Sequence, residues 1–324
     1  MDDIEAAQQG RVFKVKGCAI GMFASDAEAT RSHAQFFIGH LPRITARPDQ
    51  IKQLRQTILN LAVRGQLVPQ DPDEEPSKRW FAGLGRGSKS QKRKDVLSQA
   101  KSDEDGDSPF SPPIGWIWLK VADVFEVAGG IQKTPNRTPR NNAFPYLGVG
   151  NVYRGRLDLR EVKKFELEDG ELERRRLEPS DLLIIEGNGS INEIGRCAIW
   201  HGEIADCVHQ NHVIRCRPKD LKIAPFTLLF LNSPLGVEIM QRLAITSSGL
   251  FSLSVGKIRE IDIPLPPLPE QLRIVAKVDE LMALCDQLEA SLTTAQTEAS
   301  RLLESVLYNA LNTPASSQPS QLST

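Results

Sequence analysis

The sequence predicts an α/β (α+β) protein in which a mixed domain is joined to long coiled-coil helices. From residue 114 to residue 266, short apolar runs such as DLLIIEGNG and HVIRCRP alternate with glycine, proline and asparagine, which is typical of strands and turns. Apolar residues recur at helical spacing over residues 48–64, and again without a break from Ile274 to Val306. The chain therefore combines a strand-rich region with two helices of very different length.

Residues 48–64 form the first predicted helix. Its apolar residues follow 3-4-3 spacing on one face: Ile51, Leu54, Ile58 and Leu61. Pro48 suits a first helical turn, and Gly65 suits the left-handed position after a last turn. We expect this helix to need a partner for its apolar face, because short isolated helices are marginal in water.

Residues 83–109 are predicted to be a flexible linker. Between Lys78 and Lys101 the chain carries eight basic residues and one acid, Asp95. Two interpretations stay open for this run, a solvated linker and a non-specific contact with DNA phosphates.

The predicted organisation follows from these patterns. Residues 225–243 within the mixed domain are predicted to be helical, with an interruption at Ser233 and Pro234. The successive segments are an unassigned region, 1–44; a helical region, 45–82; the linker, 83–109; the mixed domain, 110–266; a coiled-coil helix, 267–312; and a disordered tail, 313–324.

The closing helix has the most regular pattern in the chain. Ten residues step by 4-3-4-3, as in a coiled coil: Ile274, Val278, Leu281, Cys285, Leu288, Leu292, Ala295, Ala299, Leu302 and Val306. From Pro269 to Leu311 this helix would be roughly 60 Å long. The preceding IPLPPLP is predicted to be a stiff extended connector outside helices and central strands, because its prolines lack a backbone N–H.

Composition limits the classes of function. The 324 residues carry a formal net charge of −1, so any contact with nucleic acid must use local basic patches. No run approaches the ~20 apolar residues of a membrane helix, and no membrane association is expected. The five cysteines, Cys18, Cys197, Cys207, Cys216 and Cys285, form no CxxC pair, which favours reduced thiols and a cytoplasmic location.

Common catalytic motifs are missing from the sequence. It contains no phosphate-binding GxxxxGK[ST] loop, no GxSxG or HExxH, and no Asn-Pro-Pro-aromatic run of an amino-methyltransferase. Asp181 precedes Glu186 as in some metal-dependent nucleases, but Asn188 stands where a lysine is expected. A pair of carboxylates at the end of a strand, without catalytic role, is the other interpretation.

Two cysteines and two histidines lie within ten residues: Cys207, His209, His212 and Cys216. These residue types bind zinc when they converge on one point. On a straight strand the first two would face one side and the last two the other. Half-buried strand residues, or a polar turn at Gln210 and Asn211, are the alternatives.

Four polar, glycine-rich loops remain: residues 129–142, 150–156, 186–196 and 245–258. Their Arg, Lys, Asn, Gln, Ser and Thr side chains are types that pair with base edges and phosphates. Glycine lets a backbone approach a ligand closely. Considered alone, these can also be ordinary surface loops, and both interpretations stay open.

Four stretches together resemble the specificity subunits of type I restriction-modification systems. LRQTILNLAVRGQLVPQDPDEEPS and IPLPPLPEQLRIVAKVDELMALCDQLEASL are similar to the conserved helical regions of that family. PSDLLIIEGNGSINEIGRCAI and SSGLFSLSVGKIREIDIPLPPLPEQ look like segments of its target-recognition domains. The resemblance covers residues 48–312 and is most specific at the two helices.

The resemblance implies a DNA-recognition subunit without catalysis of its own. Such a subunit reads half of a bipartite site on double-stranded DNA, and its helices dock modification (methyltransferase) and restriction subunits. It belongs to a complex that is both a site-specific deoxyribonuclease and an adenine methyltransferase. S-adenosylmethionine, ATP and magnesium would belong to the partner subunits, with no cofactor in this chain.

The sequence departs from the common family pattern in one respect. A typical member has two recognition domains and two sets of helices, whereas one domain and one long closing helix are found here, without an internal repeat. A half-subunit, a naturally single-domain form and a truncated product are all open. A half-subunit could form a homodimer, and two-fold symmetry would then give a palindromic split site.

Residues for DNA contact are chosen from the four loops as hypotheses: Lys133, Thr134, Asn136, Arg137, Asn151, Arg154, Asn188, Ser190, Asn192, Arg196, Ser247, Ser248, Ser252 and Lys257. The predicted coiled-coil or dimer contacts are Ile51, Leu54, Ile58, Ile274, Val278, Leu281, Leu288, Leu292 and Leu302. Two other functions are carried forward. One is a helical scaffold or truncated remnant without DNA binding, and the other is a stand-alone nuclease or methyltransferase.

Overall fold

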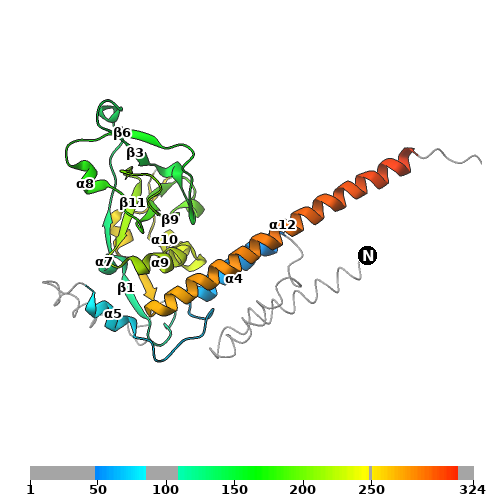
Figure 1. Cartoon of the computed structure of the whole chain (residues 1–324), viewed down its shortest axis with the longest axis horizontal. Coiled ribbons are helices and arrows are strands. Elements are labelled where there is room, and N and C mark those ends of the chain that lie inside the picture. Colours follow the sequence, from blue (N-terminus) through cyan, green and yellow to red (C-terminus); the bar gives the residue numbers. More distant parts are fainter. Residues whose placement is uncertain (1–47, 85–108, 248–249, 313–324) are drawn as a thin grey trace, which may run out of the picture.

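The structure is a computed structural model that describes residues 48–84, 109–247 and 250–312. A mixed α/β body lies at one end of a long helical rod (Figure 1), which confirms the predicted fold class. Predictions for residues 1–44, for residues 85–108 of the linker and for the tail 313–324 lie outside the described residues.

A four-stranded antiparallel sheet forms the centre of the body. Its order is β2 (Phe125–Ala128), β11 (Val213–Pro218), β7 (Leu182–Ile185) and β9 (Cys197–Ile199). All four residues of β7 are buried, and they alternate between two hydrophobic clusters. The apolar run LLII is therefore a central strand covered on both faces, as its lack of polar alternation indicates.

Smaller sheets surround the central one. One three-stranded sheet contains β10 (Val208–His209), β3 (Ala143–Leu147) and β6 (Lys163–Glu166), and the other contains β12 (Ile245–Ser247), β13 (Leu250–Ser252) and β8 (Gly187–Asn188). Two pairs complete the set: β4 (Val152–Tyr153) with β5 (Arg156–Leu157), and β1 (Ile117–Lys120) with β14 (Asp262–Leu265).

Helices cover the body and connect these strands. The short ones are α5 (Ser77–Gly83), α7 (Val121–Val124), α8 (Glu171–Arg175) and α11 (Val255–Arg259), with 3-10 turns η2 (Pro135–Arg137), η3 (Val149–Asn151), η4 (Ile191–Glu193) and η5 (Leu221–Ile223). The predicted interruption is confirmed, because α9 (Ala224–Asn232) ends at Ser233 and α10 (Pro234–Leu243) begins after it. Within the described residues no single helix meets the length and composition of a membrane span; one bent pair, Leu221–Asn232 with Pro234–Leu243, meets them only jointly across a 75° bend.

The proline-rich connector is shorter than predicted, because part of it is a strand. Pro264 lies in β14, opposite Trp118 of β1. A proline is accommodated here because β14 has a partner strand on one side only. Pro266 and Pro267, both buried, then lead directly into α12 (Leu268–Asn312).

Helix α4 (Pro48–Val63) packs antiparallel against the first part of α12 (Figure 1). Arg55 in the middle of α4 pairs with Asp286 at 2.7 Å and with Glu289 at 2.8 Å, both well along α12. After α4, the chain turns at Gly65 in the left-handed conformation, at φ 69°. Glu74 then reaches Arg273 near the beginning of α12, which fixes the opposite direction of the two helices.

The apolar contacts of this helix pair end part of the way along α12. The predicted residues Ile51, Leu54, Ile58, Ile274, Val278 and Leu281 are buried, and Leu288 and Leu292 are half-buried. Leu302, by contrast, is 67% exposed. The contact is made within the chain, and the far part of α12 keeps an uncovered apolar stripe: Leu302, Leu303, Val306, Leu307, Tyr308 and Leu311.

A buried polar contact joins the body to the first turn of α12. Glu270 is 1% exposed, and its Oε2 accepts a 2.9 Å hydrogen bond from Nε1 of Trp116, just before β1. Burial raises the pKa of Glu270 to about 7, against the opposing effect of the Trp116 hydrogen bond. Gln271 adds a second anchor, since its Nε2 donates to the carbonyl of Pro266 at 2.8 Å.

Leu281→Ala is expected to lower the free energy of unfolding by about 2–5 kcal/mol, because it opens a cavity between α4 and α12. Leu281 is 2% exposed, whereas Leu272 on the same helix is 59% exposed. Leu272→Ala is the matched control and is expected to change stability by less than about 0.5 kcal/mol. Urea denaturation measures both, and equal losses for the two variants would contradict the described packing.

Glu270→Gln is expected to change how stability depends on pH. The carboxyl titrates near 4.5 when unfolded and about 7 when folded, so the folded state holds a proton that the unfolded state releases between these values. The free energy of unfolding of the parent chain therefore falls as pH rises through this window. The variant lacks this fall and is expected to be more stable than the parent at pH 8 by about 3 kcal/mol.

Denaturation curves from pH 4 to pH 8 measure this difference. Glu298→Gln, an exposed change on the same helix, is the control and should follow the parent at every pH. If stability depends on pH in the same way for the parent and Glu270→Gln, the carboxyl has the same pKa in the folded and unfolded states. That result would contradict the prediction.

Candidate nucleic-acid interface

Contacts link the second, third and fourth predicted loops. Arg154 of the second loop donates to the carbonyl of Asn192 in the third at 3.2 Å. Arg196 of the third loop donates to the carbonyl of Val149 at 3.3 Å and lies 5.2 Å from the ring centre of Tyr153. Strand β8 in the third loop pairs with β13 in the fourth. These three loops therefore form one contiguous surface.

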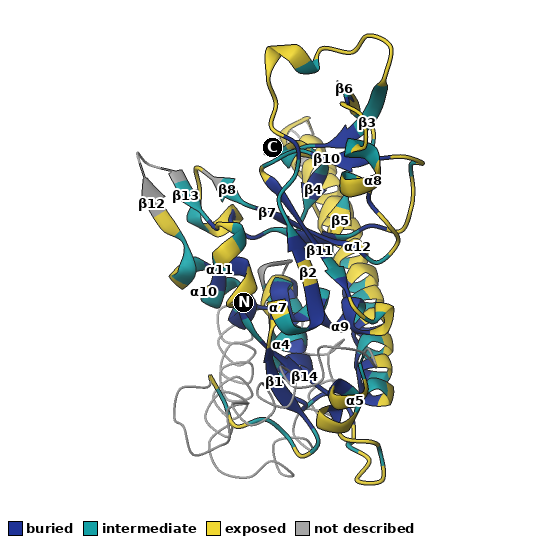
Figure 2. Ribbon diagram, turned by 90° about the vertical axis from the view of Figure 1, so that its left-hand side faces the viewer, coloured by how far each residue is buried: buried dark blue, intermediate teal, exposed yellow. Residues whose placement is uncertain are grey.

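The first loop joins this surface through a cavity. Lys133 of the first loop and Asn151 of the second both line it, and its volume is about 760 Å³. The first loop and the neighbouring β3 and β6 lie at one end of the body, opposite the end that carries α5 (Figure 2). The polar loops thus extend from that end along the side of the body.

The predicted arginines of these loops are engaged within the fold. Arg137 is 16% exposed and forms a bidentate ion pair with Glu171, whose hydrogen bonds raise the pKa of the arginine. Arg154 also donates to Oδ1 of Asn232 at 3.4 Å, and burial lowers its pKa. Arg196 is 13% exposed and pairs with Glu193 at 3.2 Å. Holding the loops in shape is the role that the geometry gives these three cations.

Asn151 is also committed to the fold. Its Oδ1 accepts from the backbone N–H of Gly148 at 2.9 Å. Its Nδ2 donates to the carbonyls of Asp158 and Glu161, each at 2.9 Å. One amide thereby closes η3 and ties it to the loop before β6, which shapes one wall of the cavity.

The other predicted contact residues differ in exposure. Lys133, Thr134, Asn136, Ser190 and Asn192 are exposed, while Ser252 and Lys257 are half-buried. Lys257 lies 3.8 Å from Glu260. Ser248 lies outside the described residues, as do the side chains of Asn188 and Ser247. Their assignment to DNA contact stays a prediction for all of these residues.

Three of the polar residues that line the cavity, Arg160, Lys163 and Gln210, are not among the predicted contact residues. Arg160 and Lys163 come from a segment without glycine, whereas the predicted loops are rich in glycine. Gln210 was placed in a polar turn, and the structure confirms a turn between β10 and β11. The sequence signal for this position is the polar pair Gln210 and Asn211, which interrupts an apolar strand.

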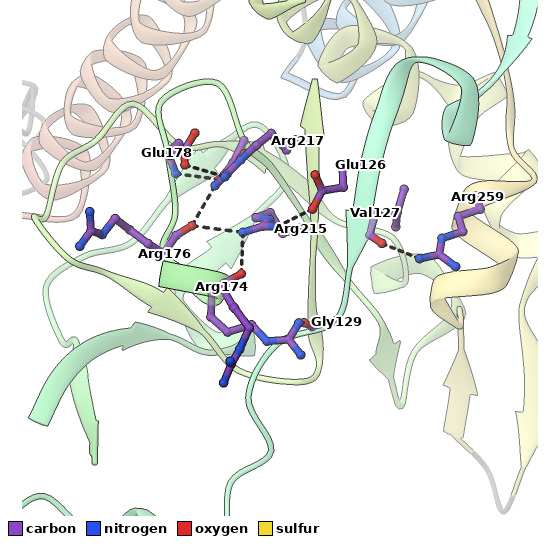
Figure 3. A network of polar contacts seen from close by, with 11 residues as sticks. Glu126, Val127, Gly129, Arg174, Arg176, Glu178, Arg215, Arg217 and Arg259 are labelled. Carbon is purple, nitrogen blue, oxygen red and sulfur yellow. Dashed lines mark hydrogen bonds and ion pairs between the residues drawn. The ribbon is translucent and has the colours of Figure 1, made fainter. Parts of the chain in front are cut away.

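Behind the loops a network of polar contacts around the buried Arg215 anchors α8 to the central sheet (Figure 3). Arg215 of β11 is 3% exposed and donates to the carbonyls of Arg174 at 3.4 Å and Arg176 at 3.2 Å. Its guanidinium also reaches Glu126 at 3.2 Å, and burial lowers its pKa. This arginine fastens the backbone of α8 to the body.

The carboxylates that suggested a nuclease are engaged in polar contacts within the fold. Asp181 is fully buried and accepts two 2.8 Å hydrogen bonds from Arg217 and one of 2.7 Å from the backbone N–H of Glu178. Glu186 lies 3.1 Å from Nδ1 of His212. The geometry therefore favours the non-catalytic interpretation of this pair.

The cysteines and histidines near residue 210 do not converge. Cys207 and Cys216 belong to different hydrophobic clusters, and burial raises the pKa of Cys207 to about 12. His209 is buried, with Nδ1 2.6 Å from the carbonyl of Val213, and burial lowers its pKa to about 4. Among the described residues, no group of three or more Asp, Glu, His and Cys side chains is arranged for a metal ion.

Comparisons with known proteins agree with the resemblance. The family model of the type I restriction modification DNA specificity domain matches residues 113–296. The EcoEI specificity subunit of Escherichia coli is 28% identical over 79% of this chain and 43% of its own length, and the EcoKI subunit of strain K12 is 26% identical over 81% and 49%.

A structural comparison finds the HsdS subunit of Thermoanaerobacter tengcongensis, at 17% identity and a TM-score of 0.45 over 94% of this chain and 58% of that one. The chain spans about half the length of the curated relatives it matches. The matched residues 113–296 run from before β1 through all strands of the body and into the packed part of α12. The chain belongs to the type I restriction-modification DNA specificity family.

Proposed function

We propose that this chain reads one half of a bipartite DNA site and holds that reading surface at a set distance from a second recognition domain. The family match over the whole strand-rich body is the observation that carries the proposal. DNA would lie along the contiguous loop surface, with exposed lysines on phosphates and polar side chains on base edges.

The charge distribution supports this placement. The net charge is −1, so attraction to DNA depends on local cations. Lys133 and Lys163 are exposed at the end of the body that carries β3 and β6. Neither forms an ion pair with the other residues that the structure describes.

The rod supports the second part of the proposal. Helix α12 is 45 residues long, or about 68 Å, and α4 covers only its first part. The uncovered apolar stripe from Leu302 to Leu311 suits a helix of another recognition subunit, such as a second copy of this chain. Modification and restriction subunits would dock on the same helices.

We place no chemical step in this chain. The modification and restriction subunits would bring S-adenosylmethionine, ATP and magnesium, and also their catalysis. A helical scaffold without DNA binding is the competing function, and it predicts no salt-dependent DNA binding by the assembled complex. Nuclease or methyltransferase activity of the purified chain alone would support the third possibility.

Lys133→Ala is expected to weaken binding to all DNA sequences alike, by removing one phosphate contact. The slope of log K against log salt concentration should become shallower by about 1. Lys52→Ala is the matched control, because Lys52 is also exposed but lies on α4, outside the loop surface and outside the basic run that begins at Lys78. Fluorescence anisotropy over a salt series measures both, and equal slopes for Lys133→Ala and the parent would contradict the phosphate contact.

The methylated motif tests the half-site proposal. The chain is co-expressed with its cognate modification subunit, and methylated bases are mapped across the genome. A symmetric split motif is expected if two copies pair, and an asymmetric one if another chain supplies the second half. No methylation with soluble, assembled subunits would favour the scaffold.

Insertion of one heptad after Thr297, in the part of α12 that α4 leaves uncovered, should lengthen the spacer of that motif by about three base pairs. Seven residues add about 10 Å of helix, and successive bases of a strand lie ~3.4 Å apart. Replacing a heptad without changing the length is the control. An unchanged spacer would show that the rod does not set the distance.

A further inference from the structure

The cavity between the first and second loops is assembled from five separate segments. It is lined by Lys133, Tyr146, Gly148, Val149, Gly150, Asn151, Asp158, Arg160, Glu161, Lys163 and Gln210. Its 760 Å³ falls within the usual range of ligand sites. The segments come from the loop before β3, the end of β3, η3, the loop before β6 and the turn after β10.

The backbone of Gln210 is held rigidly at this cavity. Its N–H donates to the carbonyl of Leu147, and its own carbonyl accepts from Val213, each at 2.9 Å. A Cβ atom added at Gly130 would lie 2.3 Å from the carbonyl oxygens of Gln210 and His209, so only glycine permits this approach. The turn that carries Gln210 is therefore fixed from both sides.

The side chain of Gln210 lies against Gly148. Its Oε1 would be 3.1 Å from a Cβ atom at Gly148, so the missing side chain leaves the space in which the amide lies. The half-buried amide forms no hydrogen bond with the other described residues. Asn151, the other amide in this cavity, donates both its amide protons and accepts one hydrogen bond within the fold.

The charges around the cavity are unevenly committed. Arg160 is paired with Asp158, and its hydrogen bonds hold the pKa of that carboxyl at about 2. Glu161 is an exposed acid, so the three cations outnumber the two carboxylates by one. Lys133 and Lys163 are exposed on two different segments, with the amide of Gln210 in the same cavity.

A glutamine amide with a free donor and a free acceptor matches one base edge in particular. In the major groove adenine presents N7 as an acceptor beside its N6 amino donor, and a glutamine can bond both at once. Lysines at the sides of such a contact suit the flanking phosphates. We propose that Gln210 reads an adenine of the target site from this cavity, with Lys133 and Lys163 on the neighbouring phosphates.

This inference rests on the proposed function and identifies a specificity residue within it. Gln210 comes from outside the four glycine-rich loops, in a turn of the strand scaffold. The turn that carries Gln210 is rigid, and a base-reading amide must be held in place because a small displacement would change its hydrogen-bond partner.

The test uses the complex co-expressed with the modification subunit, the mapped methylation motif and binding to duplexes that differ at single positions. Gln210→Ala should relax one adenine position of the motif, with roughly ten- to hundredfold less discrimination there. Gln210→Arg should shift that position toward guanine, because arginine pairs with guanine O6 and N7. Gly148→Ala, which displaces the amide, should partly relax the same position.

Gln56→Ala, an exposed change on α4, is the matched control and should keep the parent motif. If Gln210→Ala loses its cooperative thermal transition, Gln210→Glu replaces it, since it keeps the shape but lacks the amino donor. An unchanged motif in a folded Gln210 variant, or a change at a position that is not adenine in the parent, overturns the inference alone. Absence of any motif in the parent complex counts against the proposed function instead.

Discussion

The structure depends on one continuous hydrophobic core that the rod and the body share. Ile58 of α4 and Leu281 of α12 belong to the same buried cluster as Phe226 of α9 and Ile214 of the central sheet. The recognition domain is therefore not a separate unit on a tether. A swing of the body about the rod would expose residues of this cluster to water, at about 25 cal/mol for each Å² of apolar surface. The relative position of loops and rod is thus set by packing.

The rigid connection between the body and α12 also depends on a buried polar contact at Glu270. The carboxyl lies where prolines meet the first turn of α12, and it is buried in contact with Trp116. A negative group near a helix N-terminus is favoured by the dipole, but burial opposes its ionisation. Trp116 supplies the donor that makes this burial tolerable, and it also ties β1 to the rod. The hydrogen bond between Trp116 and Glu270 is directional, whereas apolar packing is not. It therefore fixes the angle between β1 and α12.

Periodicity predicted the helices well because their partner lies within the chain. The stripe on residues 48–63 and the heptads from Ile274 describe the two sides of one interface, and the run LLII describes a strand buried on both faces. The connector was only partly predicted, since its pairing with β1 depends on residues more than 140 positions earlier. The candidate site was the least predictable part. Residue type shows that Arg137 can bind a phosphate, but only the fold shows that Glu171 occupies it.

Whether a loop residue is available to bind DNA depends on its contacts within the fold as well as on its residue type. Arg154 and Arg196 bond to neighbouring loop residues and Arg137 bonds to Glu171 of α8, so the cations that first suggest a DNA-binding surface mainly keep the loops in shape. Ordering a long arginine side chain costs conformational entropy, and here that cost is met within the fold before any ligand arrives. Among the predicted contact residues, the groups that remain for the proposed DNA contact are lysines and neutral polar side chains. Lysines contribute affinity without sequence information, whereas amides at rigid positions can discriminate bases. A net charge close to zero is therefore compatible with the proposed sequence-specific binding, because hydrogen bonds from amides to base edges do not require excess positive charge.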